Sequence, residues 1–304
     1  MKELIDYLAN KLNIKNKELL EKDILLHLLL LYLEKNQNFK ENYVFKGGTC
    51  LIKCHLGYYR FSEDLDFSYV LYEKLKDKSE NQIRKELSQI IDDLSKLLLD
   101  VSKKQNLDFS KDKSNTKYYE FGANNKFTTF KLWYNSQITN KQQFIKIQIN
   151  FIEKFNYKFK TKQANNLIKD INKEEFEFLF KEYKDLLVYP KVKAYDIREI
   201  LLEKYRAILT RKALKARDFI DIFLILNNLK QENKKYKTQI LEKTKFMLTK
   251  YQKYRNNLKL RKQLGFKYIM GEEVKLMIKE INLSQISKFN DNQIAFLEKL
   301  VKEL

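Results

Sequence analysis

The stretch "VFKGGTCLIKCHLGYYRFSEDLDFSYV" covers residues 44–70 and contains three of the six glycines of this 304-residue chain. The apolar "YVFK" (43–46) predicts a short buried strand, which a pair of glycines closes. "TCLIKCHL" (49–56) then predicts a helix, and the alternation of "DLDFSYV" (64–70) predicts a second strand. The stretch therefore predicts two strands joined by a double-glycine turn and a helix.

Two carboxylates occupy the second of these strands. Asp64 and Asp66 are two residues apart, so both side chains project from the same face of a strand. Neighbouring carboxylates repel each other unless a cation lies between them, and Mg²⁺ prefers a few carboxylates together with water and phosphate oxygens. The alternative is one buried and one exposed aspartate, paired with Arg60 or Lys46. The pair thus predicts either a magnesium site or a local ion pair.

The glycines predict a place where phosphate can approach the backbone. Gly47 and Gly48 precede Thr49 at the predicted helix start, where backbone N–H groups lack partners within the helix. Glycine has no Cβ, so a phosphate can lie directly against the chain. The spacing is not that of a Walker P-loop, because the G-x-x-x-x-G-K-[ST] pattern is absent. The glycine pair is a weak signal alone, and the D-x-D strand that follows it strengthens the case for nucleotide chemistry.

Strand, G-[GS] turn, helix and D-x-D strand together resemble the active-site element of the nucleotidyltransferase superfamily that includes DNA polymerase β. More narrowly, "VFKGGTCLIK…YYRFSEDLDFSY" resembles the "KGGTxL…RFSEDxD" signature of the AbiEii/AbiGii toxin family. "LEKDILLHLLLLYL" (20–33) is similar to the N-terminal segment of that family. A later block, "REILLEKYRAILTRKALKARDFIDIFLI" (198–225), is similar to its "EKxxAxxxR…RDxxD" motif. By motif, the resemblance covers residues 15–70 and 195–228.

The later block carries two cations and two acids in an apolar helical segment. Lys204 and Arg211 lie seven residues apart on one helix face, and Asp218 and Asp221 share a face by their i,i+3 spacing. Such charges need partners, which either a triphosphate or an internal ion pair, for example Lys204 with Asp218, can supply. The resemblance implies that Lys204 and Asp218 help to form the active site, with Lys204 on the nucleotide phosphates.

The resemblance implies metal-dependent transfer of a nucleotide to an acceptor hydroxyl. Asp64 and Asp66 are the implied catalytic residues and the implied Mg²⁺ ligands. The implied nucleotide-binding residues are Gly47, Gly48, Thr49, Ser62, Lys204 and Arg211.

One expected carboxylate is missing. Enzymes of the superfamily commonly add a third carboxylate from a later strand, and the matching "FIKIQINFIE" (144–153) places Gln148 and Asn150 at the inward positions. Three alternatives stay open: Glu153 serves instead, metal binding rests on two carboxylates, or a general base is lacking.

A basic segment lies between residues 229 and 262, with 12 Lys and Arg against two Glu in a chain of net charge +20. Tyr236, Tyr251 and Tyr254 interleave with the cations, which suits a surface that tracks phosphates and stacks bases. The alternative is a solvated helix face in a lysine-rich chain. The predicted nucleic-acid contacts are Lys234, Lys235, Lys237, Lys250, Lys253 and Arg255.

Partners and compartment follow from the resemblance and from the composition. The resemblance implies a toxin of a type IV toxin–antitoxin or phage-defence system, with an NTP substrate, tRNA as the first acceptor to expect, and a separately encoded antitoxin. Two other classes stay open: a nucleotide- or RNA-binding protein that has lost catalysis, and an enzyme that modifies a protein or small-molecule hydroxyl. Apolar runs are shorter than the roughly 18–20 residues that span a bilayer, and the polar N-terminus predicts no signal peptide, so we expect a cytoplasmic protein.

Periodicity predicts an α+β nucleotidyltransferase fold, in which helices flank a mixed or antiparallel sheet and a helical C-terminal domain follows. We place the domains at 1–160 and 161–304, and expect mainly helix from about residue 174 onward. Three antiparallel strands are predicted at "KYYEF", "KFTTFKLWYN" and "QFIKIQINFIE". The helix at 79–101 should bury Ile83, Leu87, Ile90, Leu94, Leu97 and Val101.

Overall fold

The chain divides into two compact units in a computed structural model. The structure describes residues 1–71, 78–267, 275–279 and 283–304. The first unit, the sheet unit, comprises Met1–Glu153 and Phe159–Ala194, and the second, the helical unit, comprises Lys154–Lys158 and Tyr195–Leu304.

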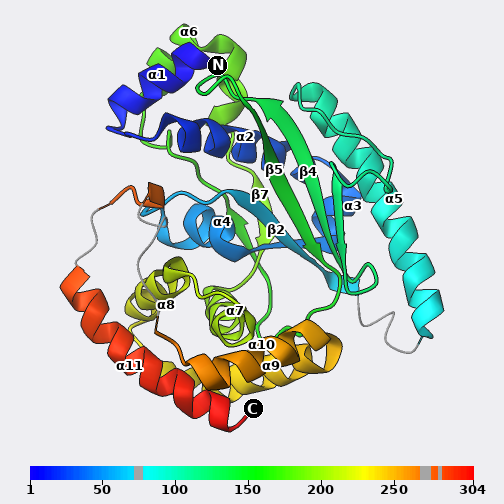
Figure 1. Cartoon of the computed structure of the whole chain (residues 1–304). Coiled ribbons are helices and arrows are strands. Elements are labelled where there is room, and N and C mark those ends of the chain that lie inside the picture. Colours follow the sequence, from blue (N-terminus) through cyan, green and yellow to red (C-terminus); the bar gives the residue numbers. More distant parts are fainter. Residues whose placement is uncertain (72–77, 268–274, 280–282) are drawn as a thin grey trace. The chain divides into compact units, whose positions relative to one another are not determined.

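The sheet unit contains a seven-stranded mixed sheet in the order β3-β4-β5-β2-β1-β7-β6 (Figure 1). Its elements are α1 (Lys2–Lys11), α2 (Lys17–Glu34), α3 (Gln37–Asn42), β1 (Tyr43–Lys46), α4 (Gly47–Leu51), the π-helix η1 (Ile52–Leu56), β2 (Asp64–Tyr69), α5 (Glu80–Lys104), β3 (Tyr119–Gly122), β4 (Phe127–Asn135), β5 (Gln142–Asn150), β6 (Lys160–Gln163), α6 (Lys173–Leu179), the 3₁₀-helix η3 (Lys181–Leu187) and β7 (Lys191–Ala194). β2 runs parallel to β5 and β1 runs parallel to β7, while the other neighbours are antiparallel. The predicted α+β fold with a mixed sheet is confirmed.

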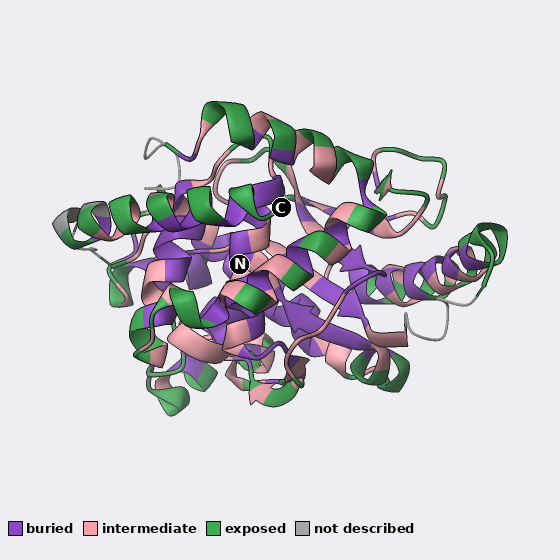
Figure 2. Ribbon diagram, turned by 90° about the horizontal axis from the view of Figure 1, so that it is seen from below, coloured by how far each residue is buried: buried purple, intermediate pink, exposed green. Residues whose placement is uncertain are grey.

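The two faces of the central strands differ in chemistry. Phe45, Phe67 and Ile147 point to one face and are fully buried, because α3 and α5 pack against that face. The register places Lys46 beside Asp66, and Asp66 beside Gln148, on the opposite face. Figure 2 shows much of the central strands in purple, the colour of buried residues. The sheet therefore separates an apolar core from a row of polar side chains.

Helix α5 buries a stripe that differs from the predicted one at two positions. Ile91 and Leu98 are fully buried, whereas the predicted Ile90 and Leu97 are only half-buried. A helical repeat of 3.6 residues permits steps of three or four, so the spacing alone fits either choice. Packing against the sheet decides between them.

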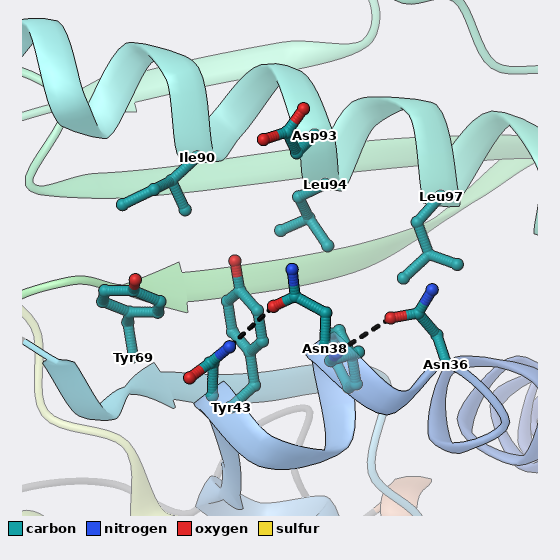
Figure 3. A pocket seen from close by; sticks show the side chains of 10 residues that line it. Asn36, Asn38, Tyr43, Tyr69, Ile90, Asp93, Leu94 and Leu97 are labelled. Carbon is teal, nitrogen blue, oxygen red and sulfur yellow. Dashed lines mark hydrogen bonds between the residues drawn. The ribbon is translucent and has the colours of Figure 1, made fainter.

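A pocket of about 220 Å³ lies between α3, α5 and the ends of β1 and β2. Figure 3 shows Ile90 and Leu94 of α5 facing Tyr43 and Tyr69 across it. Side chains alternate along a strand, so both tyrosines lie on the face opposite to that of Asp66. This pocket is therefore separate from the predicted carboxylate site.

Three short elements were absent from the prediction: α3, β6 and β7. In the strands "KTKQ" (160–163) and "KVKA" (191–194), lysine alternates with Thr, Gln, Val and Ala. β6 lies at the edge of the sheet, where charged residues discourage pairing with other chains, and in both strands the lysines weaken the apolar pattern. Phe45 of β1 pairs with Ala194 of β7, so these strands belong to the sheet unit.

The helical unit consists of packed helices within its described residues (Figure 1). They are α7 (Ile197–Thr210), α8 (Ala216–Leu229), the 3₁₀-helix η4 (Asn233–Tyr236), α9 (Lys237–Lys250), α10 (Gln252–Leu264) and α11 (Leu283–Lys302). Across the part of the chain that is described, none of the helices combines the length and the apolar character that a membrane span requires.

Candidate active site

The two predicted metal ligands lie on the polar face of the sheet. Asp64 and Asp66 are both partly exposed, while Leu65 between them is fully buried. The register pairs Asp64 with Lys146 and Asp66 with Gln148 of the parallel strand β5. Both carboxylates thus project from the same face, as the alternation predicts.

Gly47 is required because the Asp66 carboxylate lies against it. Gly47 has a φ of +76°, and a Cβ built on it would lie 2.2 Å from Oδ2 of Asp66. Real Cβ atoms never approach an oxygen so closely, so any side chain at this position would displace the carboxylate. The turn after β1 and the acid on β2 therefore meet at one corner of the sheet.

Gly48 is required by a second contact from the protein itself. A Cβ on Gly48 would lie 2.7 Å from Nη2 of Arg60 and 3.1 Å from Oγ of Ser62. Arg60 is 1% exposed and its Nη1 donates a hydrogen bond of 2.7 Å to the Phe61 carbonyl oxygen. The double glycine thus makes room for Asp66 and Arg60. That the N–H groups at the start of α4 are accessible to a phosphate remains a prediction.

Thr49 joins α4 to the carboxylate strand. Its hydroxyl is hydrogen-bonded to the Ser62 hydroxyl at 2.8 Å and donates to the backbone carbonyl of Asp64 at 2.5 Å. Thr49 is only 1% exposed, and its hydroxyl is used within the protein by Ser62 and Asp64, so contact of its backbone N–H with phosphate remains a prediction. The structure brings together the predicted residues of this unit, which are Gly47, Gly48, Thr49, Ser62, Asp64 and Asp66.

The position beside Asp66 on β5 holds an amide. Gln148 is its register partner, and the Gln148 amide nitrogen lies 3.3 Å from Oγ1 of Thr129. The carboxylate of Glu153 is 3% exposed and lies 3.3 Å from the ammonium of Lys46, the antiparallel neighbour of Asp66. Glu153 therefore balances the charge of a lysine beside the carboxylate pair.

The donor set of this corner fits Mg²⁺. Among the described residues, no group of three or more His, Cys, Asp and Glu side chains is placed to hold a metal ion. Mg²⁺ usually keeps several waters and is bound by one or two carboxylates and substrate phosphates, so it does not need a complete protein cage. Asp64 and Asp66, both partly exposed on one strand face, supply that kind of donor set.

In the helical unit, the predicted cations and acids form an ion-pair cluster. The Lys204 ammonium lies 2.8 Å from Oδ1 of Asp218 and 2.5 Å from Oδ2 of Asp221, and Arg211 pairs with the other oxygen of Asp218. Burial on its own would raise the pKa of the Asp218 carboxyl, but Lys204 and Arg211 outweigh it and lower this pKa. The structure thus contains the internal pair of Lys204 and Asp218, and contact with a nucleotide remains a proposal.

The predicted nucleic-acid contacts divide into exposed and half-buried cations. Lys234, Lys235, Lys250 and Lys253 are exposed. Lys237 is half-buried and pairs with Glu303 at 2.6 Å, and half-buried Arg255 donates to the Leu248 carbonyl. The exposed lysines fit a phosphate-binding surface better than the other two residues do.

The tyrosines of the basic segment do not form the predicted stacking surface. Tyr236 is 1% and Tyr251 is 9% exposed, so both rings belong to the core, and Tyr254 packs on Tyr251 with ring centroids 4.9 Å apart. Tyr236 and Tyr251 lie on the buried side of this segment. The residue types alone do not show whether a tyrosine lies on a buried or an exposed face.

Sequence reasoning named Arg60 and Lys46 only as possible partners of the aspartates and gave Lys53 no role, and the structure buries all three residues. A signal existed for each: a lone cation within an apolar run must find a buried partner or remain unsatisfied. Lys46 pairs with Glu153 and Lys53 pairs with Asp23, and both acids are too distant in sequence to be identified from the spacing.

Comparison with known proteins gives the family. Two crystal structures of Helicobacter pylori proteins align with the chain at 15% identity: JHP933, with a TM-score of 0.44 over 95% of this chain and 95% of that one, and a candidate nucleotidyltransferase, with a TM-score of 0.45 over 95% and 98%. A search of curated proteins found no match. A family model described as "Nucleotidyl transferase AbiEii toxin, Type IV TA system" matches residues 29–296. The chain therefore belongs to the AbiEii family of nucleotidyltransferase toxins of type IV toxin–antitoxin systems.

Proposed function

We propose that this nucleotidyltransferase transfers a nucleoside monophosphate from an NTP to the 3′ end of tRNA, with Mg²⁺ held by Asp64 and Asp66. The observation that carries the proposal is the contact of the Asp66 carboxylate with the Gly47 turn. It places the acid pair at the start of α4, where free N–H groups suit phosphate. The family supplies the reaction class, the NTP and an antitoxin as partner.

The residues of this corner would divide the work between them. An acceptor hydroxyl attacks the α-phosphorus, so that a new P–O bond forms, the bond to the β-phosphate oxygen breaks, and pyrophosphate leaves. Bound Mg²⁺ would supply charge neutralisation for the triphosphate. The N–H groups of Gly48 and Thr49 would bind phosphate oxygens. With Gln148 beside Asp66, the hydroxyl proton passes to solvent.

Three further residues belong to the proposal through the family motif alone. They are Lys204, Arg211 and Asp218. Lys204 would offset phosphate charge, which requires that it exchange a contact with Asp218 or Asp221 for the nucleotide.

An RNA acceptor is supported by charge. Exposed Lys234, Lys235, Lys250 and Lys253 lie in a chain of net charge +20, and clustered surface cations bind nucleic-acid phosphates. Transfer to tRNA would arrest translation, which accords with a toxin and with a role in phage defence. Its substrates would place the enzyme in the cytoplasm.

The test is incubation of the protein with total tRNA, Mg²⁺ and each α-labelled NTP in turn. Label in tRNA, lost when EDTA replaces Mg²⁺, is the expected result. Label only in protein or in a small molecule would overturn the tRNA acceptor, and NTP binding without any transfer would overturn catalysis.

Replacement of Asp66 ties the reaction to the corner. Asp66→Asn should abolish transfer and leave thermal unfolding near that of the wild type, because the amide keeps the volume and loses the charge. Asp100→Asn makes the same change at an exposed position on α5 and should transfer normally. A fully active Asp66→Asn protein would show that the carboxylate is structural.

A further inference from the structure

The helix that begins at the glycine corner changes its winding after one turn. α4 (Gly47–Leu51) continues directly into η1 (Ile52–Leu56), a π-helix. π-helical turns are rare in proteins, and those that do occur are often found at functional sites. The carbonyl oxygen of Lys53 within this turn accepts a hydrogen bond of 2.9 Å from the backbone N–H of Asn165, which follows β6.

The side chain of Lys53 enters a closed polar cluster. It is fully buried, and its ammonium lies 2.9 Å from Oδ1 of Asp23 on α2 and 2.5 Å from the hydroxyl of Tyr58. That hydroxyl in turn donates to Oδ2 of Asp23 at 2.8 Å. Burial and the Asp23 charge both raise the pKa of Tyr58, so the phenol keeps its proton and its role as donor. The three side chains bond one another in a ring.

Stability gives little reason for such a cluster. Buried ion pairs contribute little net stability, because desolvation of two charges offsets their attraction, and apolar side chains of similar volume often do as well or better. The cluster instead restricts the orientation of the helix. Lys53 can pair with Asp23 in only one orientation of the helix, whereas an apolar side chain could pack in several orientations. The contact therefore fixes geometry.

Two anchors act on this short helix. Thr49, in its first turn, bonds to Ser62 and to the carbonyl of Asp64 on β2. Lys53, in its second turn, bonds to Asp23 on α2. Thr49 thus contacts β2 and Lys53 contacts α2, one on each side of the point where the α-helix becomes a π-helix. Together the anchors restrict rotation of the helix about its axis.

We propose that Lys53 is a positioning residue, which through Asp23 and Tyr58 sets the direction of the N–H groups of Gly48 and Thr49 toward the triphosphate. This inference rests on the proposed function, because it assigns those N–H groups to phosphate. Lys53 itself touches no substrate.

The test replaces the cluster by apolar side chains of similar volume. The triple variant Asp23→Leu/Lys53→Met/Tyr58→Phe removes both charges together and leaves no buried charge without a partner. We expect its melting temperature to stay within a few degrees of the wild type, its KM for NTP to rise at least tenfold, and its KM for tRNA to be unchanged. Binding of a non-hydrolysable NTP with Mg²⁺, measured by calorimetry, should weaken at least tenfold as well.

A control variant on the same helix tests specificity. Glu21 of α2 is also buried, but its carboxylate accepts from the Ser136 hydroxyl at 2.6 Å and from the backbone N–H of Gln137 at 2.7 Å. Glu21→Gln should change stability and leave the affinity for NTP as it is. Equal losses of affinity in the two variants would reduce the cluster to a structural role.

The outcomes separate this inference from the proposed function. If the wild type transfers label and the triple variant has wild-type KM and affinity for NTP, the positioning role is wrong and the function stands. If the wild type transfers nothing, the function fails, and nucleotide affinity of the two variants still decides whether Lys53 directs the corner.

Discussion

Single residues at the glycine corner have reasons that are visible only in three dimensions. The sequence predicts that Gly47 and Gly48 leave the backbone open to phosphate, and the structure adds that the Asp66 carboxylate and the Arg60 guanidinium occupy the space where their side chains would be. Part of this could be predicted, since adjacent glycines in a glycine-poor chain indicate close approach of some group. Which group approaches depends on the pairing of β1 with β2, and no local pattern fixes that register.

Gly47→Ala tests this contact. The alanine would meet Oδ2 of Asp66 and would also hold a φ of +76°, which costs roughly 1–3 kcal/mol for a residue with a side chain. We expect transfer to fall more than tenfold and the melting temperature to drop. Gly57→Ala is the matched control, because Gly57 has a φ of +75° with nothing within 4 Å of the new methyl group. It should lose stability alone, and a Gly47→Ala enzyme that transfers at the wild-type rate would contradict the account.

His27 gives a prediction on pH. It is fully buried on α2, its Nε2 lies 2.9 Å from the Val188 carbonyl oxygen, and burial with the nearby charge of Lys53 lowers its pKa to about 3. The unfolded chain takes up this proton below about pH 6.5, whereas the folded chain does not, so folding stability falls with pH in that range. The loss due to His27 should reach about 2 kcal/mol at pH 5.

Chemical unfolding of the wild type and of His27→Gln between pH 7.5 and pH 5 measures this loss. As the pH falls, the unfolding free energy of the wild type should decrease by about 2 kcal/mol more than that of the variant. Burial raises the pKa of Glu34 to about 7, which makes folding more stable as pH falls, but Glu34 is present in both proteins and cancels. A difference that is constant with pH would mean that folded His27 takes up the proton.

At the scale of elements, buried charge pairs join helices of the helical unit. Lys243 of α9 lies 2.7 Å from Oε1 of Glu199 on α7, and both side chains are fully buried. The second oxygen of Glu199 accepts the backbone N–H groups of Asn156 and Tyr157 at 2.8 Å each. Lys243 therefore serves the core, although it belongs to the same basic segment as the exposed lysines.

Lys243→Met should destabilise the protein by about 3–5 kcal/mol, because it leaves the Glu199 charge buried without this cation. Lys245→Met, at an exposed position two residues along α9, should change stability by less than about 0.5 kcal/mol. Urea unfolding at pH 7.5 measures both. If both substitutions changed the unfolding free energy by the same small amount, Glu199 would be solvated without Lys243, which contradicts the prediction.

Elements with strong periodicity were predicted well, and short ones were not. β1, β2, the antiparallel strands β3 to β5 and helix α5 follow from apolar spacing. β6 and β7 carry lysines in four-residue strands and gain their identity from pairing with each other and with β1. The π-turn at η1 was not predicted either, and the contacts that Lys53 makes there, with Asn165 and Asp23, come from residues far away in sequence.

At the scale of the whole molecule, charge reversal tests the RNA surface. One variant changes Lys234, Lys235, Lys250 and Lys253 to Glu. Its control changes Lys15, Lys85, Lys103 and Lys111, which are also exposed, and so alters net charge equally. We expect the first variant to bind tRNA more weakly and to lessen the slope of log affinity against log salt, by about 0.7–0.9 for each lost phosphate contact. Equal slopes in both variants would attribute binding to net charge alone.

The family and the reaction class were predictable because both motifs, at residues 44–70 and 198–225, can be recognised in the sequence. The family match confirms the family and the reaction class. The ion pairs within the second motif were not predictable. Lys204 is bonded to both Asp218 and Asp221, an arrangement that is one of several compatible with the spacing. Tyrosines of the basic segment were misjudged for the same reason, since composition reports residue types and burial depends on packing.

The central claim is that Asp64, Asp66 and the glycine turn hold one metal–nucleotide complex. A crystal structure of the protein with Mg²⁺ and a non-hydrolysable NTP tests it most directly. The account predicts one Mg²⁺ within about 2.1 Å of an oxygen of each aspartate, with triphosphate oxygens bonded to that ion and to the N–H groups of Gly48 and Thr49. A triphosphate bound elsewhere, or a metal ion that neither aspartate contacts, would contradict it.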